Sequence, residues 1–198
     1  MAWLSPDELA FMGFASIGKN VLISEKASLY NCSRISIGNN VRIDDFCVLS
    51  AGAGGIFIGK YVHIAVYSSL MGAGKITMSD FSGISSRVSI YSSNDDYSGA
   101  TMTNPTVSSL YTGVTHADVT LGRHVIVGAG CVILPGVTLH EGVAVGALSL
   151  INEDCNAFGI YIGAPARHIG SRKKDLLEKE RLLLQEERTC NDQISSAD

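Results

Sequence analysis

Aliphatic residues recur at every sixth position between residues 119 and 155. The series starts at Leu121 and continues without exception through Val127, Ile133, Leu139, Val145 and Ile151. Four residues after each of these lies a second position that holds a small or β-branched residue: Val125, Cys131, Val137, Val143, Ser149 and Cys155. A period of six is typical of a parallel β-helix, in which each short strand forms one side of a coil and three sides complete the turn.

The same period runs through the first half of the chain, with short insertions. It begins at Ile17 and is displaced by two or three residues at 35–37, 51–55 and 76–78. We expect insertions of this size to bulge out at the corners of the solenoid, so that successive coils still hydrogen-bond at the normal spacing of strands. Together the two blocks predict an all-β domain of about seven coils over residues 15–170.

The segments on either side of the repeat have the pattern of helices. Ser5 and Glu8 form a capping box, which predicts a short helix within residues 1–14. Such a helix would cover the first coil, whose open strand edge would otherwise pair with other chains. Leucines interleaved with charges predict a second helix over 171–190, packed on the last coil or between subunits. We expect residues 191–198 to be disordered.

Residues 91–118 interrupt the repeat. Polar residues, glycine and proline dominate this stretch, and no register of six survives in it. A long excursion inside a regular solenoid is more often functional than not. We therefore expect this loop to carry part of a site.

Composition narrows the class of protein. The chain of 198 residues is 46% hydrophobic and only 17% charged, as expected of one sheet-rich domain. A formal charge of −4 gives no basic surface for nucleic acid. No apolar run is long enough to span a membrane, and the first residues lack the pattern of a signal peptide. We therefore expect a cytoplasmic protein.

The cysteines do not suggest a metal site or a disulfide framework. None of the five forms a CxxC pair. Cys47, Cys131 and Cys155 fall on the small inward position of the repeat, which predicts buried free thiols.

The motifs around the repeat resemble those of the hexapeptide-repeat acyltransferases over about residues 15–170. That resemblance rests on the repeat together with ILPGV at 133–137 and GAPAR at 163–167. Within the family, the chain is most similar to bacterial N-acetyltransferases that act on nucleotide-linked amino-deoxysugars of the dTDP-4-amino-4,6-dideoxyglucose type, for O-antigen. This finer similarity lies in SNDDYSG at 93–99, TNPT at 103–106 and EGVAVGALSLI at 141–151.

The resemblance also implies a handedness, an oligomeric state and a set of substrates, which the period of six does not. It implies a left-handed β-helix, although parallel crossovers are normally right-handed. It also implies a homotrimer that binds acetyl-CoA between adjacent subunits, takes a nucleotide sugar as acceptor and needs no metal.

The resemblance also places the cofactor. Small residues at corners one coil apart would let the pantetheine arm lie against the backbone. The tight corners of the solenoid would by themselves also favour glycine. Basic residues beyond them would meet the phosphates. The cofactor residues expected on this basis are Gly128, Ala129, Gly146, Ala147, Gly163, Ala164, Pro165, Arg167 and Lys173, with Arg172 and Lys174 as further basic candidates.

The start of the excursion departs from the pattern of the family's O-acetyltransferases, because residues 91–96 contain no histidine. An alcohol needs a base to become a nucleophile, whereas a free amine is already one. The sequence therefore favours N-acetylation by direct attack of the amine on the thioester. The catalytic candidates are Asp95, Asp96 and His116, and the candidate sugar or nucleotide contacts are Asn94, Tyr97 and Asn104.

Three alternatives remain open at this point. The first is an O-acetyltransferase on a sugar, polysaccharide or antibiotic with His116 as the base. The second is a zinc hydratase, for which His63, His116 and His124 are the only trio, at a spacing unlike that site. We otherwise interpret His63 and His124 as ordinary surface histidines. The third is a β-helix without catalysis.

Overall fold

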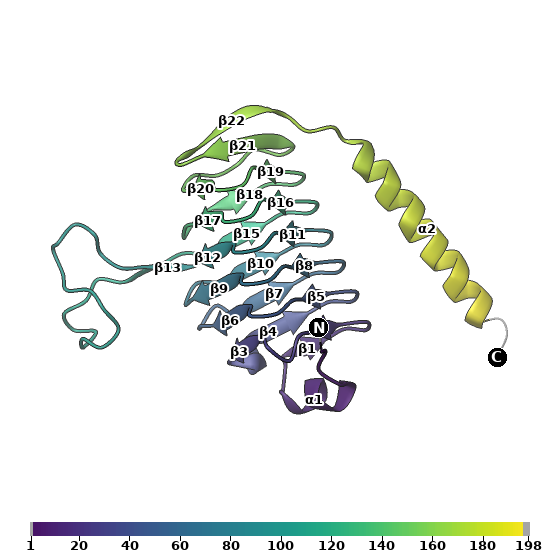
Figure 1. Ribbon diagram of the computed structural model, residues 1–198, viewed down its shortest axis with the longest axis horizontal. Coiled ribbons are helices and arrows are strands. Elements are labelled where there is room, and N and C mark those ends of the chain that lie inside the picture. The colour runs from purple at the N-terminus through teal and green to yellow at the C-terminus, as the bar shows by residue number, and fades with distance from the viewer. Residues whose placement is uncertain (1, 196–198) are drawn as a thin grey trace.

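Three sheets, parallel except for the last strand β22, form the three sides of a solenoid of about seven left-handed coils (Figure 1). The computed structural model describes residues 2–195. Sheet I contains β1 (Ser16–Ile17), β4 (Ile35–Ile37), β7 (Ile56–Ile58), β10 (Ile76–Met78), β15 (Val119–Leu121) and β18 (Thr138–Leu139). Sheet II contains β2 (Leu22–Ile23), β5 (Arg42–Ile43), β8 (His63–Ile64), β11 (Gly83–Ile84), β16 (Ile126–Val127), β19 (Ala144–Val145), β21 (Gly159–Gly163) and β22 (Ala166–Ser171). Sheet III contains β3 (Ser28–Tyr30), β6 (Val48–Ala51), β9 (Ser69–Gly72), β12 (Ser89–Tyr91), β17 (Val132–Ile133) and β20 (Leu150–Ile151).

The period of six places aliphatic side chains inside the solenoid, as predicted. Leu121, Val127 and Ile133 have no exposed surface. Each stacks on a similar side chain one coil away, Leu121 on Leu139 and Ile133 on Ile151. Burying one such side chain contributes about 1.5–3 kcal/mol, so the stacked interior is the main source of stability.

The coils of the first half are longer than those of the second. Strand partners one coil apart are 20 or 21 residues apart in the first half, and in the second half 18 apart, or 16 between β19 and β21. The two-residue insertion at 35–37 does not bulge outward as expected, since Ile35 and Ile37 are both buried. Side chains alternate along a strand, so an insertion of two returns both isoleucines to the interior.

The excursion leaves the solenoid at the edge between sheets III and I (edge III–I). Its foot is a short antiparallel pair, β13 (Ser93–Asn94) and β14 (Thr115–His116). The loop beyond this pair extends away from the solenoid (Figure 1). β12 ends at Tyr91 and β15 begins at Val119, so the excursion covers residues 92–118, one residue later at its start than the expected 91–118.

The N-terminal segment covers the first coil. Helix α1 (Pro6–Phe11) has the expected capping box at Ser5 and buries Leu9 against the core. Just before it, Trp3 pairs with Ser24 beside β2. The guanidinium of Arg42, one coil further on, lies over the Trp3 ring at 5.4 Å. The segment therefore covers both the apolar end of the core and part of the open sheet edge.

The C-terminal helix starts and ends later than the sequence predicted. Residues 166–171 form β22, which turns back on β21 in an antiparallel pair. Helix α2 (Asp175–Ser195) therefore begins after this strand. Residues 191–195, which we expected to be disordered, continue the helix because no glycine or proline ends it. Residues 196–198 of that expected tail lie outside the described residues.

Helix α2 is held along the edge between sheets I and II (edge I–II). Glu180 Oε2 lies 2.8 Å from His124 Nε2, and Glu180 also pairs with Arg123. Further along the helix, the Tyr61 hydroxyl donates to Glu187. The His124 side chain is only 10% exposed, so the interpretation of it as an ordinary surface histidine is wrong. Burial is also the main cause that lowers the pKa of His124.

A column of stacked side chains follows the same edge. Asn20 donates to Asn40 at 3.0 Å, Tyr61 stacks on Phe81, and Phe81 stacks on His124. All five residues have positive φ, which L-residues adopt only at some cost. The stacking contacts help to offset that cost at each corner.

Candidate active site

A hollow of about 260 Å³ lies on the outer face of sheet II, and we call it the serine hollow. Gly83 lies between His63 on β8 and Ile126 on β16, its neighbours in the sheet. Because Gly83 has no side chain, the two larger residues face each other across an open floor. The lining residues are His63, Ala65, Gly83, Ile84, Ser85, Ser86 and Ile126.

A buried carboxylate supports the histidine of this hollow. His63 Nε2 lies 2.9 Å from Asp44 Oδ2. Arg42 Nε donates to the other carboxylate oxygen, Oδ1, at 2.6 Å. The Asp44 side chain is 6% exposed and that of His63 is 49% exposed. His63 therefore faces outward and is half-exposed, as its repeat position predicts, but a buried anion holds its ring.

The glycine–alanine pairs predicted to line the cofactor groove lie next to this hollow. Gly128–Ala129 and Gly146–Ala147 follow sheet II strands at the edge between sheets II and III (edge II–III), one coil apart. Gly130 N–H donates to Ser86 O at 3.0 Å, which connects the first pair to the serine hollow. A Cβ on Gly128 would lie 2.5 Å from Ala147 N. Close packing of the coils therefore already requires this glycine, whatever lies outside.

The GAPAR segment continues the same edge and forms the turn between β21 and β22. Gly163 pairs with Ala166, with Ala164 and Pro165 at the tip. The Arg167 side chain is exposed, and its Nη1 donates to Ala166 O at 3.1 Å. Lys173 is exposed too, but β22 runs back across sheet II, so Lys173 lies between Arg172 and Lys174 at edge I–II and not on the predicted cofactor edge.

Two of the further basic candidates lie at a different edge. Arg172 Nη1 donates to His124 O at 2.6 Å and to Gly142 O at 3.2 Å, at edge I–II. Burial lowers the pKa of Arg172. Lys174 lies over the Phe158 ring, 4.8 Å from its centre. In this structure both residues stabilise corners of the solenoid.

The excursion forms a second hollow of about 410 Å³, which we call the loop hollow. It brings together three of the residues predicted from the sequence, Asn94, Asp95 and Asn104. In the part of the chain that the structure describes, no group hydrogen-bonds to the Asp95 carboxylate. The other lining residues are Ser93, Pro105, Val107, Ser109, Thr112 and Val114.

Asp96 and Tyr97 do not line the loop hollow. Asp96 accepts hydrogen bonds from the backbone N–H groups of Ser98 and Thr101, at 2.8 and 2.9 Å, and from the Thr101 hydroxyl at 3.0 Å. These bonds, those of Ser98 first, hold the pKa of Asp96 well below its usual range. Tyr97 is 88% exposed. The structure therefore places Asp96 as a turn-stabilising residue.

His116 lies at the foot of the excursion. Its Nδ1 is 2.8 Å from Ser93 Oγ, and that hydroxyl also accepts from Ala73 N–H at 2.7 Å. His116 is therefore tied to the start of the loop and is not among the residues that line either hollow.

The two hollows lie at opposite ends of one strand. The serine hollow ends with Ser85 and Ser86, just before β12, at edge II–III, and the loop hollow begins with Ser93, just after β12, at edge III–I. Sheet III therefore separates the predicted cofactor edge from the predicted acceptor loop within one chain.

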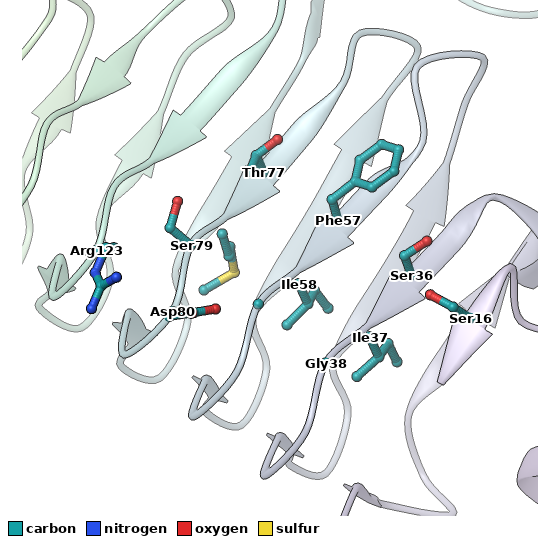
Figure 2. A pocket seen from close by; sticks show the side chains of 12 residues that line it. Ser16, Ser36, Ile37, Gly38, Phe57, Ile58, Thr77, Ser79, Asp80 and Arg123 are labelled. Atoms are coloured by element: carbon teal, nitrogen blue, oxygen red, sulfur yellow. The ribbon is translucent and has the colours of Figure 1, made fainter. Parts of the chain in front are cut away.

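A third hollow, of about 510 Å³, lies on the outer face of sheet I. Figure 2 shows its apolar floor, with Phe57 and Thr77 on the strands and Asp80 and Arg123 at one end. Asp80 Oδ1 is engaged by Lys60 N–H at 2.7 Å. None of the predicted site residues lines this hollow.

Among residues 2–195, no three histidine, cysteine or carboxylate side chains are arranged to hold a metal ion. No helix of this part of the chain combines the length and the apolar character needed to cross a membrane. Cys47, Cys131 and Cys155 are buried free thiols, as predicted, and so is Cys32.

The sequence analysis did not predict the serine hollow or the buried Asp44 carboxylate that holds His63. One signal was available. Asp44 occupies a repeat position that other coils fill with a small residue, Ala65 or Ser85, and a charge at such a position needs a partner. Arg42, two residues before Asp44, follows from the alternation of side chains along a strand, but His63 lies on the neighbouring strand of sheet II and only the coil register identifies it.

The fold and these features together define a class of protein. A left-handed parallel β-helix that carries an excursion loop and an edge of small residues is the architecture of the hexapeptide-repeat acyltransferases. A maltose O-acetyltransferase from Clostridium difficile shares the fold at 19% identity, with a TM-score of 0.59 over 85% of this chain and 75% of that one. No protein-family model matches the chain.

Two closer relatives narrow this class. The chain is 60% identical, over 91% of its length and 94% of the relative, to the dTDP-4-amino-4,6-dideoxy-D-glucose acyltransferase of Escherichia coli. It is 48% identical to AntD, an N-acyltransferase from Bacillus cereus solved in complex with dTDP and 3-hydroxybutyryl-CoA, with a TM-score of 0.91 over 94% of this chain and 98% of that one. The chain belongs to the dTDP-4-amino-4,6-dideoxyglucose acyltransferase family.

Proposed function

We propose that the protein transfers the acetyl group of acetyl-CoA to the amino group of dTDP-4-amino-4,6-dideoxyglucose. The observation that carries this proposal is the 60% identity with the E. coli acyltransferase over nearly the whole of both chains. A further AntD structure contains dTDP-4-amino-4,6-dideoxyglucose together with coenzyme A, which supports an amine acceptor and a CoA donor.

The amine attacks the thioester directly. A neutral amine is nucleophilic without a base, so the protein has to hold it close to the carbonyl carbon and in line with it. Asp95, in the loop hollow, is suited to orienting the amine because its carboxylate is not engaged by described residues. Asn94 and Asn104 lie beside it and would contact the sugar or the nucleotide.

The AntD variants support a site that includes both hollows. One series replaces a serine and another an aspartate ten positions later. Among the pairs in this chain with the same spacing, two begin in the serine hollow, Ser85 with Asp95 and Ser86 with Asp96. Either pair connects the serine hollow with the start of the excursion.

The active form on this proposal is a homotrimer with its sites between subunits. Within one chain the loop hollow and the predicted cofactor edge are on opposite sides of sheet III. A neighbouring chain would bring its excursion loop to the small-residue edge. The pantetheine arm would then follow Gly128–Ala129 and Gly146–Ala147, with Arg167 near the phosphates.

The proposal also includes a cellular setting. Both co-substrates are soluble and charged, so the reaction belongs in the bacterial cytoplasm. The acetylated nucleotide sugar would be a donor for a surface polysaccharide such as O-antigen.

The test is an acetyl-transfer assay on the purified protein. With acetyl-CoA and dTDP-4-amino-4,6-dideoxyglucose we expect release of free CoA and an acetylated sugar by mass spectrometry. The matched control acceptor is dTDP-6-deoxyglucose, which carries a hydroxyl in place of the amine. Turnover of the hydroxyl sugar, with none of the amine, would identify an O-acetyltransferase and contradict the proposal.

Two variants test direct attack by the amine. We expect Asp95→Asn to lower the rate and His116→Ala to leave most of it. If His116→Ala abolishes transfer and Asp95→Asn does not, the direct-attack mechanism is wrong, and His116 is the base.

A further inference from the structure

We propose that His63, oriented by the buried Asp44, accepts the proton that the amine loses during acetyl transfer. This inference rests on the proposed function. Four observations carry it: the contact of His63 with Asp44, the burial of that carboxylate, the open floor at Gly83, and the position of the hollow beside the cofactor edge.

The Asp44 contact sets the protonation of the two ring nitrogens. Asp44 is an acceptor, so a neutral His63 ring donates its Nε2–H to Oδ2 at 2.9 Å. That tautomer leaves a lone pair on Nδ1. No described group hydrogen-bonds to Nδ1, and the ring is half-exposed over the serine hollow. His63 therefore presents a base to the hollow, while Asp44 acts as a positioning residue.

The charges around the ring come from one neighbouring strand. On β5, Arg42 lies directly opposite His63 in the sheet and donates to Asp44. On the other side, β11 presents Gly83, which carries no charge. Asp44 is thus the charged group in contact with the ring, and Arg42 binds the second oxygen of that carboxylate.

The hollow is where the reacting end of the cofactor belongs. If the phosphates lie near Arg167, the pantetheine arm runs from there along Gly163, Gly146 and Gly128 toward Ser85. The serine hollow is the next space along that edge. The thioester carbonyl would then lie within reach of His63.

The step balances in atoms and electrons. The amine nitrogen forms a bond to the thioester carbon, which gives an ammonium and an alkoxide. The ammonium proton passes to His63 Nδ1. The carbon–sulfur bond then breaks, the carbonyl re-forms, and the imidazolium returns the proton to the thiolate sulfur. The products are the amide and free CoA.

His63→Gln is the most informative substitution. A glutamine amide can still donate to Asp44, but it offers no basic nitrogen to the hollow. We expect kcat to fall by about 100-fold or more, the usual contribution of a general base. We expect KM for both substrates and CoA binding by calorimetry to be unchanged. His140→Gln is the matched control, because His140 is exposed on the solenoid and lines neither hollow.

Two further measurements separate a base from a structural residue. Added imidazole should restore activity to His63→Ala and have no effect on the wild type or on His63→Gln. Asp44→Asn should lower kcat and change KM little, since Asp44 orients the His63 ring and does not contact the substrates. Failure of imidazole to rescue a folded His63→Ala protein that binds CoA would overturn the inference.

The wild-type protein provides a test that does not depend on a variant folding. Imidazole ¹⁵N NMR should find the Nε2–H tautomer at His63, and the Nδ1 signal should shift when the amino sugar and CoA are added together. The opposite tautomer would overturn the inference. If the wild type does not acetylate the amino sugar, the proposed function fails. If it does and His63→Gln keeps the wild-type kcat, only the role of His63 is wrong.

Discussion

Asp95 and Asp96 are adjacent in the chain but have different surroundings. Asp96 accepts hydrogen bonds from Ser98 and Thr101, which closes a turn of the loop. Asp95 lines the loop hollow with Asn94. From the sequence the two carboxylates were equivalent, because the partners of Asp96 follow only from the folded turn.

We expect Asp95→Asn to lower kcat/KM for the amino sugar by about 100-fold and to leave CoA binding unchanged. An amide of the same shape cannot stabilise the positive charge that the nitrogen develops. Asp96→Asn should first increase proteolysis within the loop, since it weakens the turn. Steady-state kinetics and limited proteolysis of both variants check this. If Asp96→Asn lowers kcat/KM and Asp95→Asn increases proteolysis, then Asp96 acts in the reaction and Asp95 stabilises the turn.

The buried thiols predict a dependence on alkaline pH. Burial raises the pKa values of Cys47 and Cys155 to about 11, from about 9 for an exposed thiol. A raised pKa in the folded state contributes stability that is fully present below pH 9 and lost as the pH rises to 11. We expect the free energy of unfolding in guanidinium to fall over that window, and to fall less in Cys47→Ala. If the free energy of unfolding of Cys47→Ala falls between pH 9 and 11 as steeply as that of the wild type, the Cys47 thiol is not a cause of the fall.

At the scale of elements, the sequence predicted the strands better than what lies outside them. Spacing alone identified the inward positions because side chains alternate along a strand. The same alternation explains why the insertion at 35–37 was placed wrongly, since an insertion of two fits inside the coil. Helix α2 and the pair of Asp44 with His63 depend on contacts between distant residues, which periodicity does not encode.

The excursion can be tested as an element. Replacing residues 95–114 with Asn-Gly would join β13 and β14 by a tight turn that suits an antiparallel pair. No residue of that segment belongs to the buried core cluster, so we expect the melting temperature to be nearly unchanged. Acetyl transfer should be lost, because Asp95 and Asn104 are removed. Retained transfer to the amino sugar would show that the loop is not part of the site.

At the scale of the whole molecule, the chain separates its loop hollow from its small-residue edge. If each site combines the loop of one subunit with the edge of another, two different defects can complement each other. Ala147→Trp should block the edge, where a side chain of this size fills the path of the cofactor. Asp95→Asn should disable the loop.

We expect each of these variants to be inactive alone, and mixed trimers of the two to regain part of the wild-type activity. In a mixed trimer, some sites combine an intact loop with an intact edge. Co-expression with two affinity tags, followed by the acetyl-transfer assay, measures this. Light scattering should give the mass of three chains. A fully active monomer, or no recovery in verified mixed trimers, would contradict a site between subunits.

The contact between Trp3 and Arg42 gives the molecule its own spectroscopic reporter. Trp3 is the only tryptophan of the chain, and its ring lies under the guanidinium that holds Asp44. Asp44 in turn holds His63, so a ligand that moves His63 will change the electric field at the indole. Emission from Trp3 should therefore follow filling of the serine hollow in a simple fluorescence titration. In Asp44→Asn the Trp3 emission should not change during the same titration.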